Sequence, residues 1–404
     1  MLAVTYILDG LKVIDAATHI AAPAAGTILS DFGADVIKVE APHGDGCRLL
    51  RGKSVAEDYC WLLTSRNKRS ICLDLKKAAG RELLNQLVAS ADVFLTNFRE
   101  HQIRRFEMDY EALRKANPRL IYAHVSSYGR KGPDGNQLDS DMASWWARTG
   151  ILDAVSSLGK EAISAAEGIG DHVTALGLLS AVMMALYQRE KTGEGGFVST
   201  SLVASGCYAN SLALQSAIAV NNSDVAFQEE MGLSRSSMKC YRTRDDKSVI
   251  LVIINLVQEW SRIAKALGHK EWLKDPEFQD IAGSQKCRDK ILSRISLAIS
   301  ELNLKDLCLM LDQHGLVYSA VEKPGDVIRD AHLIENEIFV RTKSDFPEYE
   351  WTVNNPINIR GFKKKQPAEA PESGEHSEQV LKEMGLTDSK IRDLIKAGVV
   401  LKSN

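Results

Sequence analysis

One acidic residue stands where a nucleophile would be useful. In the segment EGIGDHVT, Asp171 follows two glycines, Gly168 and Gly170, and precedes a long apolar run that indicates a helix. We predict that Asp171 occupies the N-cap, where unpaired N–H groups and the positive end of the helix dipole favour an ionised carboxylate. Such a carboxylate is ready to act as a nucleophile at neutral pH. The alternative is an aspartate that only caps the helix.

The elements that must position Asp171 follow an α/β pattern. Short β-branched runs alternate with helical patterns through the first half of the chain, which predicts an open, mostly parallel sheet of the Rossmann-like kind. We expect strands at residues 12–15, 35–40, 70–74, 92–96, 120–126 and 196–200, and helices at residues 22–32, 78–89, 110–117, 171–187 and 202–217. The helix from Asp171 is expected to be buried and to end at Gly193, a residue type that suits a helix C-terminus.

A chain of 404 residues exceeds the size at which one core keeps growing, so we expect two domains. We assign residues 1–205 and 335–404 to the large domain and residues 206–334 to a smaller α+β domain. The small domain is expected to contain a strand at residues 249–254 and helices at residues 257–267 and 288–299, with a helix and strand between residues 304 and 321.

Composition narrows the class of partner. The net charge is −3, and no basic tract is longer than three lysines, so neither a nucleic-acid groove nor a membrane surface is predicted. Seven cysteines without C-x-x-C spacing predict neither a disulfide framework nor a zinc site, and we predict no metal. No basic leader opens the chain, and the apolar run at residues 174–187 is shorter than the roughly 20 residues that span a bilayer. We therefore expect a cytoplasmic protein that acts on small molecules.

Five segments in a fixed order carry a family resemblance. They are IAAPAAGTILSDFGADVIKVEAPHGD, RNKRSICLDLK, ADVFLTNFR, EGIGDHVTALG and YQREKTGEGG. In this order they resemble the class III CoA-transferases, a superfamily that includes formyl-CoA and carnitine-CoA transferases and 2-methylacyl-CoA racemases. The resemblance runs from residue 8 to residue 381 and is weakest between residues 221 and 345.

The resemblance implies the chemistry of Asp171. The position that matches Asp171 is the covalent nucleophile of the family, which attacks an acyl-CoA to give an aspartyl anhydride and then an aspartyl-CoA thioester. A carboxylic acid acceptor then takes the CoA. Coenzyme A is thus a substrate, no cofactor is permanently bound, and the family forms homodimers whose subunits interlock like chain links.

The resemblance also suggests which residues hold the CoA moiety, and all of them follow strand ends, where open α/β sheets bind ligands. Basic side chains there can meet the phosphates while an aromatic ring flanks the adenine. The matching positions are Leu75, Lys76, Asn97, Phe98, Arg99 and Arg105. Taken singly, each cation has an alternative role as a solvated surface group.

The substrate pocket is predicted around Ile20, Trp145 and Gly170. Ile20 replaces a glutamine found in formyl- and oxalate-type transferases, and their glycine-rich lid has no counterpart in residues 231–237, which hold one glycine. These departures argue against a small dicarboxylate and favour 2-hydroxy acids with bulky side chains, with Trp145 as an apolar wall or as an ordinary core residue. Gly168 and Gly170 permit the close backbone approach that stabilising an oxyanion requires.

Three other functions compete with CoA transfer. Lys38 and Glu40 end a strand where an NAD-binding acid is expected, but no G-x-G-x-x-G follows the first strand. Racemisation would use a histidine–aspartate pair, for which His19 and His172 are available. The racemase histidine, however, belongs to an upstream segment that here, at residues 138–142, contains none. A protein that binds CoA without catalysis is the third alternative.

Overall fold

The chain divides into two compact units. The computed structural model describes residues 6–49, 58–135, 137, 140–156, 164–219 and 238–402. The large unit comprises Met1–Ser211 with Ala331–Asn404, and the small unit comprises Leu212–Asp330. That residues 206–334 form a separate domain stays a prediction.

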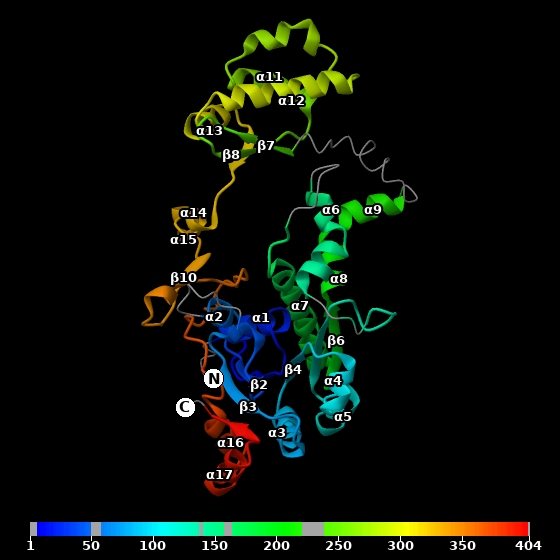
Figure 1. The fold of residues 1–404 in the computed structure, drawn as a ribbon, viewed down its shortest axis with the longest axis vertical. Coiled ribbons are helices and arrows are strands. Elements are labelled where there is room, and N and C mark those ends of the chain that lie inside the picture. Colours follow the sequence, from blue (N-terminus) through cyan, green and yellow to red (C-terminus); the bar gives the residue numbers. More distant parts are fainter. Residues whose placement is uncertain are drawn as a thin grey trace. The chain divides into compact units, whose positions relative to one another are not determined.

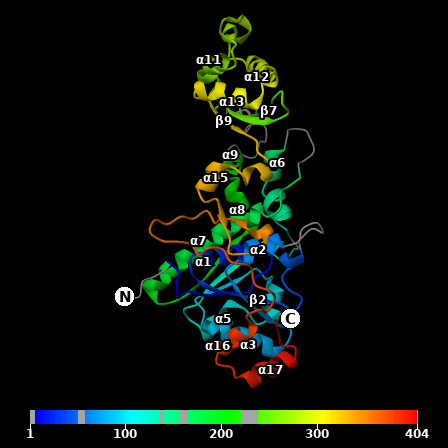
Figure 2. The same cartoon turned by 90° about the vertical axis from the view of Figure 1, so that its left-hand side faces the viewer.

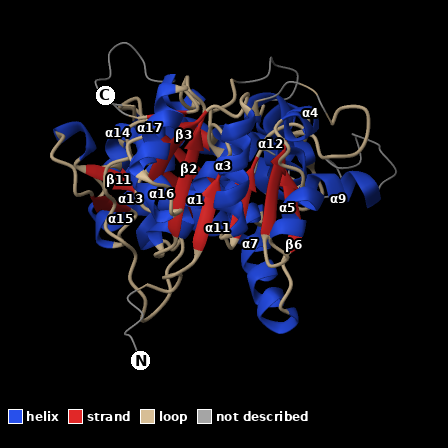
Figure 3. Cartoon of the chain, turned by 90° about the horizontal axis from the view of Figure 1, so that it is seen from below, coloured by secondary structure: helices blue, strands red, loops and turns tan. Residues whose placement is uncertain are grey.

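A seven-stranded sheet formed by the described residues is the centre of the large unit (Figure 3). Its order is β12-β3-β2-β1-β4-β5-β6, and every neighbouring pair is parallel except β12 with β3. The strands are β1 Lys12–Asp15, β2 Asp35–Glu40, β3 Arg69–Leu73, β4 Val93–Thr96, β5 Ile121–Ser126, β6 Gly196–Ser201 and β12 Val400–Leu401. The predicted Rossmann-like parallel sheet is confirmed. Strand order reverses between β1 and β4, which is where such sheets bind ligands beyond their carboxyl ends.

Helices cover both faces of the sheet because successive strand residues point to opposite sides. Val13, Val36 and Val93 pack with α1 (Ala21–Asp31) and α7 (Ile169–Thr192). Figure 1 shows α7 beside α1. The other face carries α3 Ala78–Ala89, α5 Tyr110–Ala116, α16 Ser377–Glu383 and α17 Asp388–Lys396. Figure 2 shows the two C-terminal helices, in red, near α3.

Helix α7 is longer and less buried than predicted. It begins at Ile169 and ends at Thr192, and Gly193 follows with a left-handed φ of 78° and donates its N–H to the Arg189 carbonyl. By length and mean hydropathy this 24-residue helix is apolar enough to cross a membrane. One side packs against α1, β5 and β6, while Met184 and Tyr187 are 71% and 66% exposed. The prediction of a buried helix is therefore wrong for one side of α7. Apolar side chains project from all sides of this helix, and the rest of the large unit covers only some of them.

Shorter elements connect these layers in the large unit. They are α2 Tyr59–Ser65, α4 Glu100–Arg105, α6 Ile151–Val155, α8 Leu202–Ala209, the 3-10 turn η1 Gly46–Leu49 and the π-helical segment η2 Met142–Ala147. The single helix predicted from Leu202 onwards is two, because α8 ends at Ala209 and α9 (Ser211–Ala219) begins after the C-cap residue Asn210. After the small unit the chain returns through α15 Ala331–Glu335, β10 Phe339–Arg341, η6 Pro347–Tyr349 and β11 Trp351–Val353.

The small unit is α+β, as predicted. Its antiparallel strands β7, β8 and β9 carry the helices α11, α12 and α13 around one apolar core. In that core the rings of Trp260 and Trp272 stack at 5.7 Å. The elements are β7 Met238–Arg242, β8 Ser248–Val252, α11 Leu256–Ala266, η4 Lys270–Lys274, η5 Pro276–Phe278, α12 Gln285–Ser300, α13 Leu304–Gln313, β9 Val317–Ala320 and α14 Pro324–Val327. Residues 231–237, compared with the lid of other transferases, lie outside the described residues.

Candidate active site

Asp171 lies in the first turn of α7, three residues after its N-cap. The N-cap is Gly168, whose left-handed φ of 79° lets the helix begin at Ile169. The predicted N-cap position of Asp171 is therefore wrong, because the glycine takes the turn that precedes the helix. The half-buried Asp171 nevertheless stays within the turn where the helix dipole favours negative charge.

Trp145 packs directly against this first turn. A Cβ atom placed on Gly170 would lie 2.5 Å from Cγ of Trp145, a distance that side chains do not tolerate. Trp145 is 5% exposed, and its ring meets that of Trp146 edge-on at 5.1 Å. Its indole N–H has no hydrogen-bond partner among the residues described. The structure thus brings Trp145 and Gly170 together beside Asp171.

Ile20 lies close to the same turn, although it is far from Asp171 in the sequence. It is the N-cap residue of α1, and its Cδ1 lies 3.7 Å from where a Cβ of Gly168 would stand. The preceding residue, His19, has a left-handed φ of 63°, and its N–H donates to Oδ1 of Asp45 at 3.1 Å. The β1–α1 loop is therefore held in an unusual conformation that presents Ile20 to α7.

Asn97 holds this loop from the neighbouring strand. Its Oδ1 accepts the N–H of Thr18 at 2.9 Å, and its Nδ2 donates to the carbonyl of Thr18 at 2.8 Å. Asn97 follows β4 and Thr18 follows β1, so the pair bridges the point where strand order reverses. One predicted CoA residue thereby lies next to the loop that carries Ile20.

The other CoA-binding candidates are spread along the same sheet edge. Phe98 is partly buried against the core on the sheet face that α3, α5, α16 and α17 cover. Its carbonyl accepts Nε2–H of His124, whose pKa is lowered by burial. Arg99 is the N-cap residue of α4, and its N–H donates to Oε1 of Gln102 at 3.1 Å. Arg105 lies in the last turn of α4. These three therefore cluster around α4.

Leu75 and Lys76 lie farther along the edge. They follow β3, which is separated from β4 in the sheet by β2 and β1. The N–H of Lys76 donates to Oδ1 of Asp74, while the next residue, Lys77, donates its Nζ to the carbonyls of Ala397 and Gly398. Lys77 is thus engaged by the end of α17, and Lys76 is exposed. That Leu75 and Lys76 bind CoA stays a prediction.

A buried charge network below the loop was missed by the sequence analysis. Nζ of Lys38 lies 2.9 Å from Oδ2 of Asp45, and Nζ of Lys68 lies 2.8 Å from Oδ2 of Asp15. Burial alone would lower the pKa of Lys38, but Asp15 and Asp45 outweigh it and hold that pKa above its usual value. The network fixes Asp45, which in turn accepts the N–H of His19. Strand order brings Asp15, Lys38 and Lys68 together, and Asp45 joins them from the loop that follows β2.

The family model described as "CoA-transferase family III" matches residues 8–377, which is nearly the whole chain. The chain belongs to CoA-transferase family III. The resemblance predicted from the five sequence segments is therefore confirmed, and with it the assignment of this protein to the class III CoA-transferase enzymes.

Named relatives of this family III protein agree in length and class. The chain is 28% identical to an (R)-2-hydroxy-4-methylpentanoate CoA-transferase of Clostridioides difficile, over 98% of this chain and 99% of that protein. It is also 28% identical to a cinnamoyl-CoA:phenyllactate CoA-transferase of Clostridium sporogenes, over 97% of each chain. A crystal structure of a CAIB/BAIF family protein from Brucella suis matches with a TM-score of 0.81 and 25% identity, covering 94% of this chain and 100% of that one. These relatives do not favour the racemase alternative.

The N–H groups of Gly168 and Gly170 are hydrogen-bonded to a neighbouring carboxylate in this family III site. The N–H of Gly168 donates to Oδ2 of Asp141 at 2.9 Å, and the N–H of Gly170 also stabilises that carboxylate. That these glycines permit the close backbone approach an oxyanion requires stays a prediction. In this conformation Asp141, directly before η2, occupies their N–H groups. Neighbouring His172 is exposed, and its Nδ1 lies 2.7 Å from the Gly168 carbonyl.

Glu40, the strand-end acid considered for NAD, has structural partners. Its carboxylate pairs with Arg48 at 2.8 Å and accepts the hydroxyl of Ser70 at 2.7 Å. Glu40 is 3% exposed, so its oxygens face the protein rather than a ribose. This geometry agrees with the absence of the glycine motif of dinucleotide-binding proteins.

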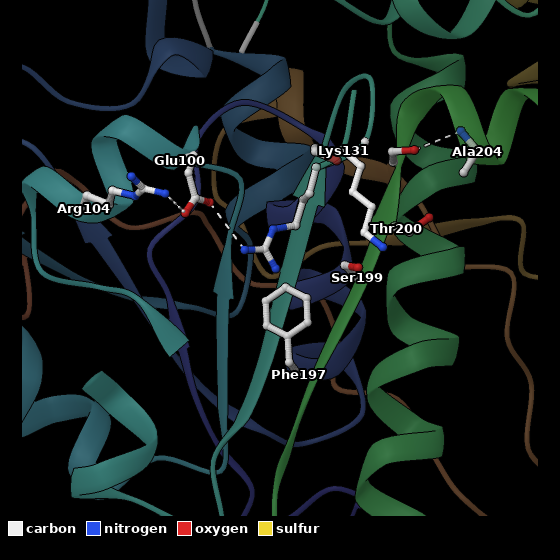
Figure 4. Close-up of a pocket in the computed structure, with 11 residues that line it drawn as sticks. Glu100, Arg104, Lys131, Phe197, Ser199, Thr200 and Ala204 are labelled. Carbon is white, nitrogen blue, oxygen red and sulfur yellow. Dashed lines mark hydrogen bonds and ion pairs between the residues drawn. The ribbon is translucent and has the colours of Figure 1, made fainter. Parts of the chain in front are cut away.

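A cavity of about 820 Å³ lies at the ends of β5 and β6 (Figure 4). Glu100 there pairs with Arg104 and with Arg130, each at 3.4 Å, while Lys131 extends toward Thr200 and Ser199 (Figure 4). Its full lining is Glu100, Arg104, Ser126, Gly129, Arg130, Lys131, Phe197, Ser199, Thr200, Ser201 and Ala204. The predicted site residues, Asp171, Ile20 and Trp145 included, are not among these lining residues.

Proposed function

We propose that the protein moves CoA from an acyl-CoA donor to a carboxylic acid acceptor, with Asp171 as the covalent carrier. One observation carries the proposal most directly: Asp171 lies in the first turn of a 24-residue helix, with Trp145 and Ile20 packed against that turn. The helix dipole favours the ionised carboxylate, and the apolar side chains offer a wall for an acyl group.

The first half-reaction loads CoA onto the enzyme. A carboxylate oxygen of Asp171 attacks the thioester carbonyl, the C–S bond breaks, and CoA leaves as a thiolate with the electron pair. The thiolate then attacks the Asp171 carbonyl of the mixed anhydride. The anhydride C–O bond breaks, the donor carboxylate leaves, and an aspartyl-CoA thioester remains.

The second half-reaction reverses these steps with the acceptor. The acceptor carboxylate attacks the aspartyl thioester and expels the CoA thiolate, which gives a second anhydride. The thiolate then attacks the acceptor carbonyl, and the Asp171 carboxylate is released unchanged. No net proton is transferred, so the protein must mainly align the reacting groups, and binding energy from the nucleotide end of CoA can be used for that alignment.

We infer that the CoA moiety lies along the carboxyl edge of the sheet, where Asn97, Phe98 and Arg99 follow β4 and Arg105 ends α4. The Asn97–Thr18 hydrogen bonds join this region to the loop of Ile20. Leu75 and Lys76 extend the same edge beyond β2. Basic side chains on such an edge suit the phosphates of CoA.

The acceptor that fits best is a 2-hydroxy acid with a bulky apolar side chain. Ile20 offers no hydrogen bond to a second carboxylate, and the half-buried Trp146 adds apolar surface next to Trp145. Relatives named for 2-hydroxy-4-methylpentanoate and phenyllactate support this substrate class. A panel of acceptors in which oxalate or formate reacts best would refute it.

We also propose a cytoplasmic homodimer with interlocked subunits. Large apolar side chains are exposed on α7 and α8: Met184 to 71%, Tyr187 to 66% and Tyr208 to 84%. Exposed apolar patches of this kind are typical of protein–protein interfaces. A second copy of the chain would bury this surface. No nucleic acid or membrane partner is proposed.

Covalent trapping tests the carrier role. The enzyme is incubated with acyl-CoA, treated with hydroxylamine or borohydride, and mapped by mass spectrometry. The label is expected on the peptide that contains Asp171, and Asp171→Ala should abolish both label and transfer. The exposed Glu167→Gln, in the same loop, is the matched control and should keep both.

Measurements of α-proton exchange and CoA binding, made beside the trapping experiment, separate the alternatives. Exchange of the α-proton with deuterated water without any acceptor acid would indicate a racemase, and binding of CoA with neither label nor exchange would indicate a binding protein. Label on another residue would refute Asp171 as the carrier.

A further inference from the structure

Asp141 is an acidic residue next to the active site to which no role has been assigned. It is 7% exposed, and its Oδ2 accepts the N–H of Gly168 at 2.9 Å. The N–H groups of Met142 and Gly170 also stabilise its ionised form. Desolvation outweighs these bonds and raises the pKa of Asp141, so the carboxylate is buried at a cost. A group retained at a cost deserves a functional explanation.

The carboxylate joins two segments that carry the site. On one side, Asp141 directly precedes η2, the π-helical segment whose Trp145 packs on Gly170. On the other side it binds the start of α7 at Gly168 and Gly170, three residues and one residue before Asp171. Single π-helical turns are often found at functional sites, where they place a side chain that a regular helix would not.

No side chain at the N-cap of α7 pairs with the free N–H groups of its first turn. Its N-cap is Gly168, which has no side chain to accept the free N–H groups of the first turn, and Gly170 adds a second flexible position. Asp141 supplies the missing cap from another part of the chain. Without it, the turn that carries Asp171 would have unpaired N–H groups and two glycines to absorb movement.

We propose that Asp141 is a positioning residue that fixes the first turn of α7 and thereby the direction of the Asp171 carboxylate. This rests on the proposed role of Asp171 as the carrier. Asp141 does not touch the reacting atoms in this proposal. Its effect is on the geometry of attack, to which transfer between a carboxylate and a thioester is sensitive, since misplacement by about 1 Å can cost about 100-fold in rate.

The test compares Asp141→Ala and Asp141→Asn with wild type at saturating acyl-CoA, measuring the rate at which label appears on Asp171. Asp141→Ala should slow labelling and kcat by about 10- to 100-fold, with the KM for acyl-CoA changed less than about threefold. Asp141→Asn should recover part of the rate, because its amide oxygen still accepts the N–H of Gly168. Asp153→Asn, an exposed acid on α6, is the control and should behave as wild type.

Asp141→Asn keeps the side-chain shape, so the test stands even where Asp141→Ala does not fold. Wild-type labelling rates in both variants, or an increased KM at unchanged kcat, would overturn the positioning role. Failure of the wild-type enzyme to label at Asp171 would instead refute the carrier proposal, so the two failures are distinguishable.

Discussion

The indole of Trp145 lies so close to Gly170 that a Cβ at position 170 would stand 2.5 Å from its Cγ. Gly170 has ordinary helical backbone angles, so the glycine is required for space and not for a left-handed conformation. The contact locks η2 to α7 one residue before Asp171. Any side chain at position 170 must therefore move Trp145 or the helix.

Replacing Gly170 with alanine should reduce both stability and activity. The buried indole must shift, and overpacking of this kind costs about 1–3 kcal/mol, which exceeds the gain in helix propensity of roughly 1 kcal/mol. We expect a lower free energy of unfolding in urea and a lower kcat for Gly170→Ala. An enzyme as stable and active as wild type would show that the indole moves freely.

Gly177→Ala is the matched control for that variant because it lies in the same helix. A Cβ there meets only Oγ1 of Thr200 at 3.8 Å, an ordinary contact. With helix propensity as the main term, this variant should be as stable as wild type or more stable by up to about 1 kcal/mol. Its transfer rate should be unchanged.

The two hydrogen bonds between Asn97 and the backbone of Thr18 should control the affinity for acyl-CoA. Asn97→Ala removes two hydrogen bonds to the backbone of Thr18 and leaves half-buried polar groups unpaired, at a cost of about 1 kcal/mol. We expect an increased KM for acyl-CoA in steady-state assays. Thr18→Ala leaves both backbone groups in place and should change the KM little. An equal increase of the KM in the two variants would contradict the role of these backbone hydrogen bonds.

The buried charge network should contribute a pH-dependent stability. Burial would raise the pKa of Asp45, but Lys38 outweighs it and holds that pKa below its usual value. A carboxyl with a lowered folded-state pKa stabilises the fold above its unfolded pKa of about 4, and the contribution is lost as the pH falls through the folded-state pKa.

Asp45→Asn breaks this pair and should destabilise the protein by about 3 kcal/mol at neutral pH. Urea unfolding of variant and wild type across a pH series checks the prediction. The difference between the two should shrink in acid below about pH 4. A difference that is constant with pH would contradict the role given to the Asp45 charge.

The exposed apolar side of α7 predicts a dimer that a single charge should weaken. Met184 is 71% exposed, and Met184→Glu would bury an unpaired carboxylate in the proposed interface. Size-exclusion chromatography with light scattering should show a dimer for wild type and a larger monomer fraction for the variant. Leu309→Glu, at a 53% exposed residue of the small unit, is the control. A wild-type monomer would refute the dimer.

The sequence alone was sufficient for the class of fold and for the family. Strands such as residues 35–40 and the helix at residues 78–89 are local patterns, since their periodicity and boundaries depend on neighbouring residues. The order of five short segments indicated the class III CoA-transferases, and the glycines around Asp171 marked the candidate nucleophile. Boundaries at glycines were less predictable, because Gly168 can start a helix three residues ahead of the acid that resembled a cap.

Only the tertiary structure decided which distant residues serve the site. Asp141 and Trp145 reach the first turn of α7 through a π-helical segment, and Lys38 reaches Asp15 because β2 lies beside β1. Such contacts depend on strand order and helix packing, and residues far apart in sequence carry no local signal of them. The sequence determined what chemistry is available, and the packing determined which groups surround Asp171.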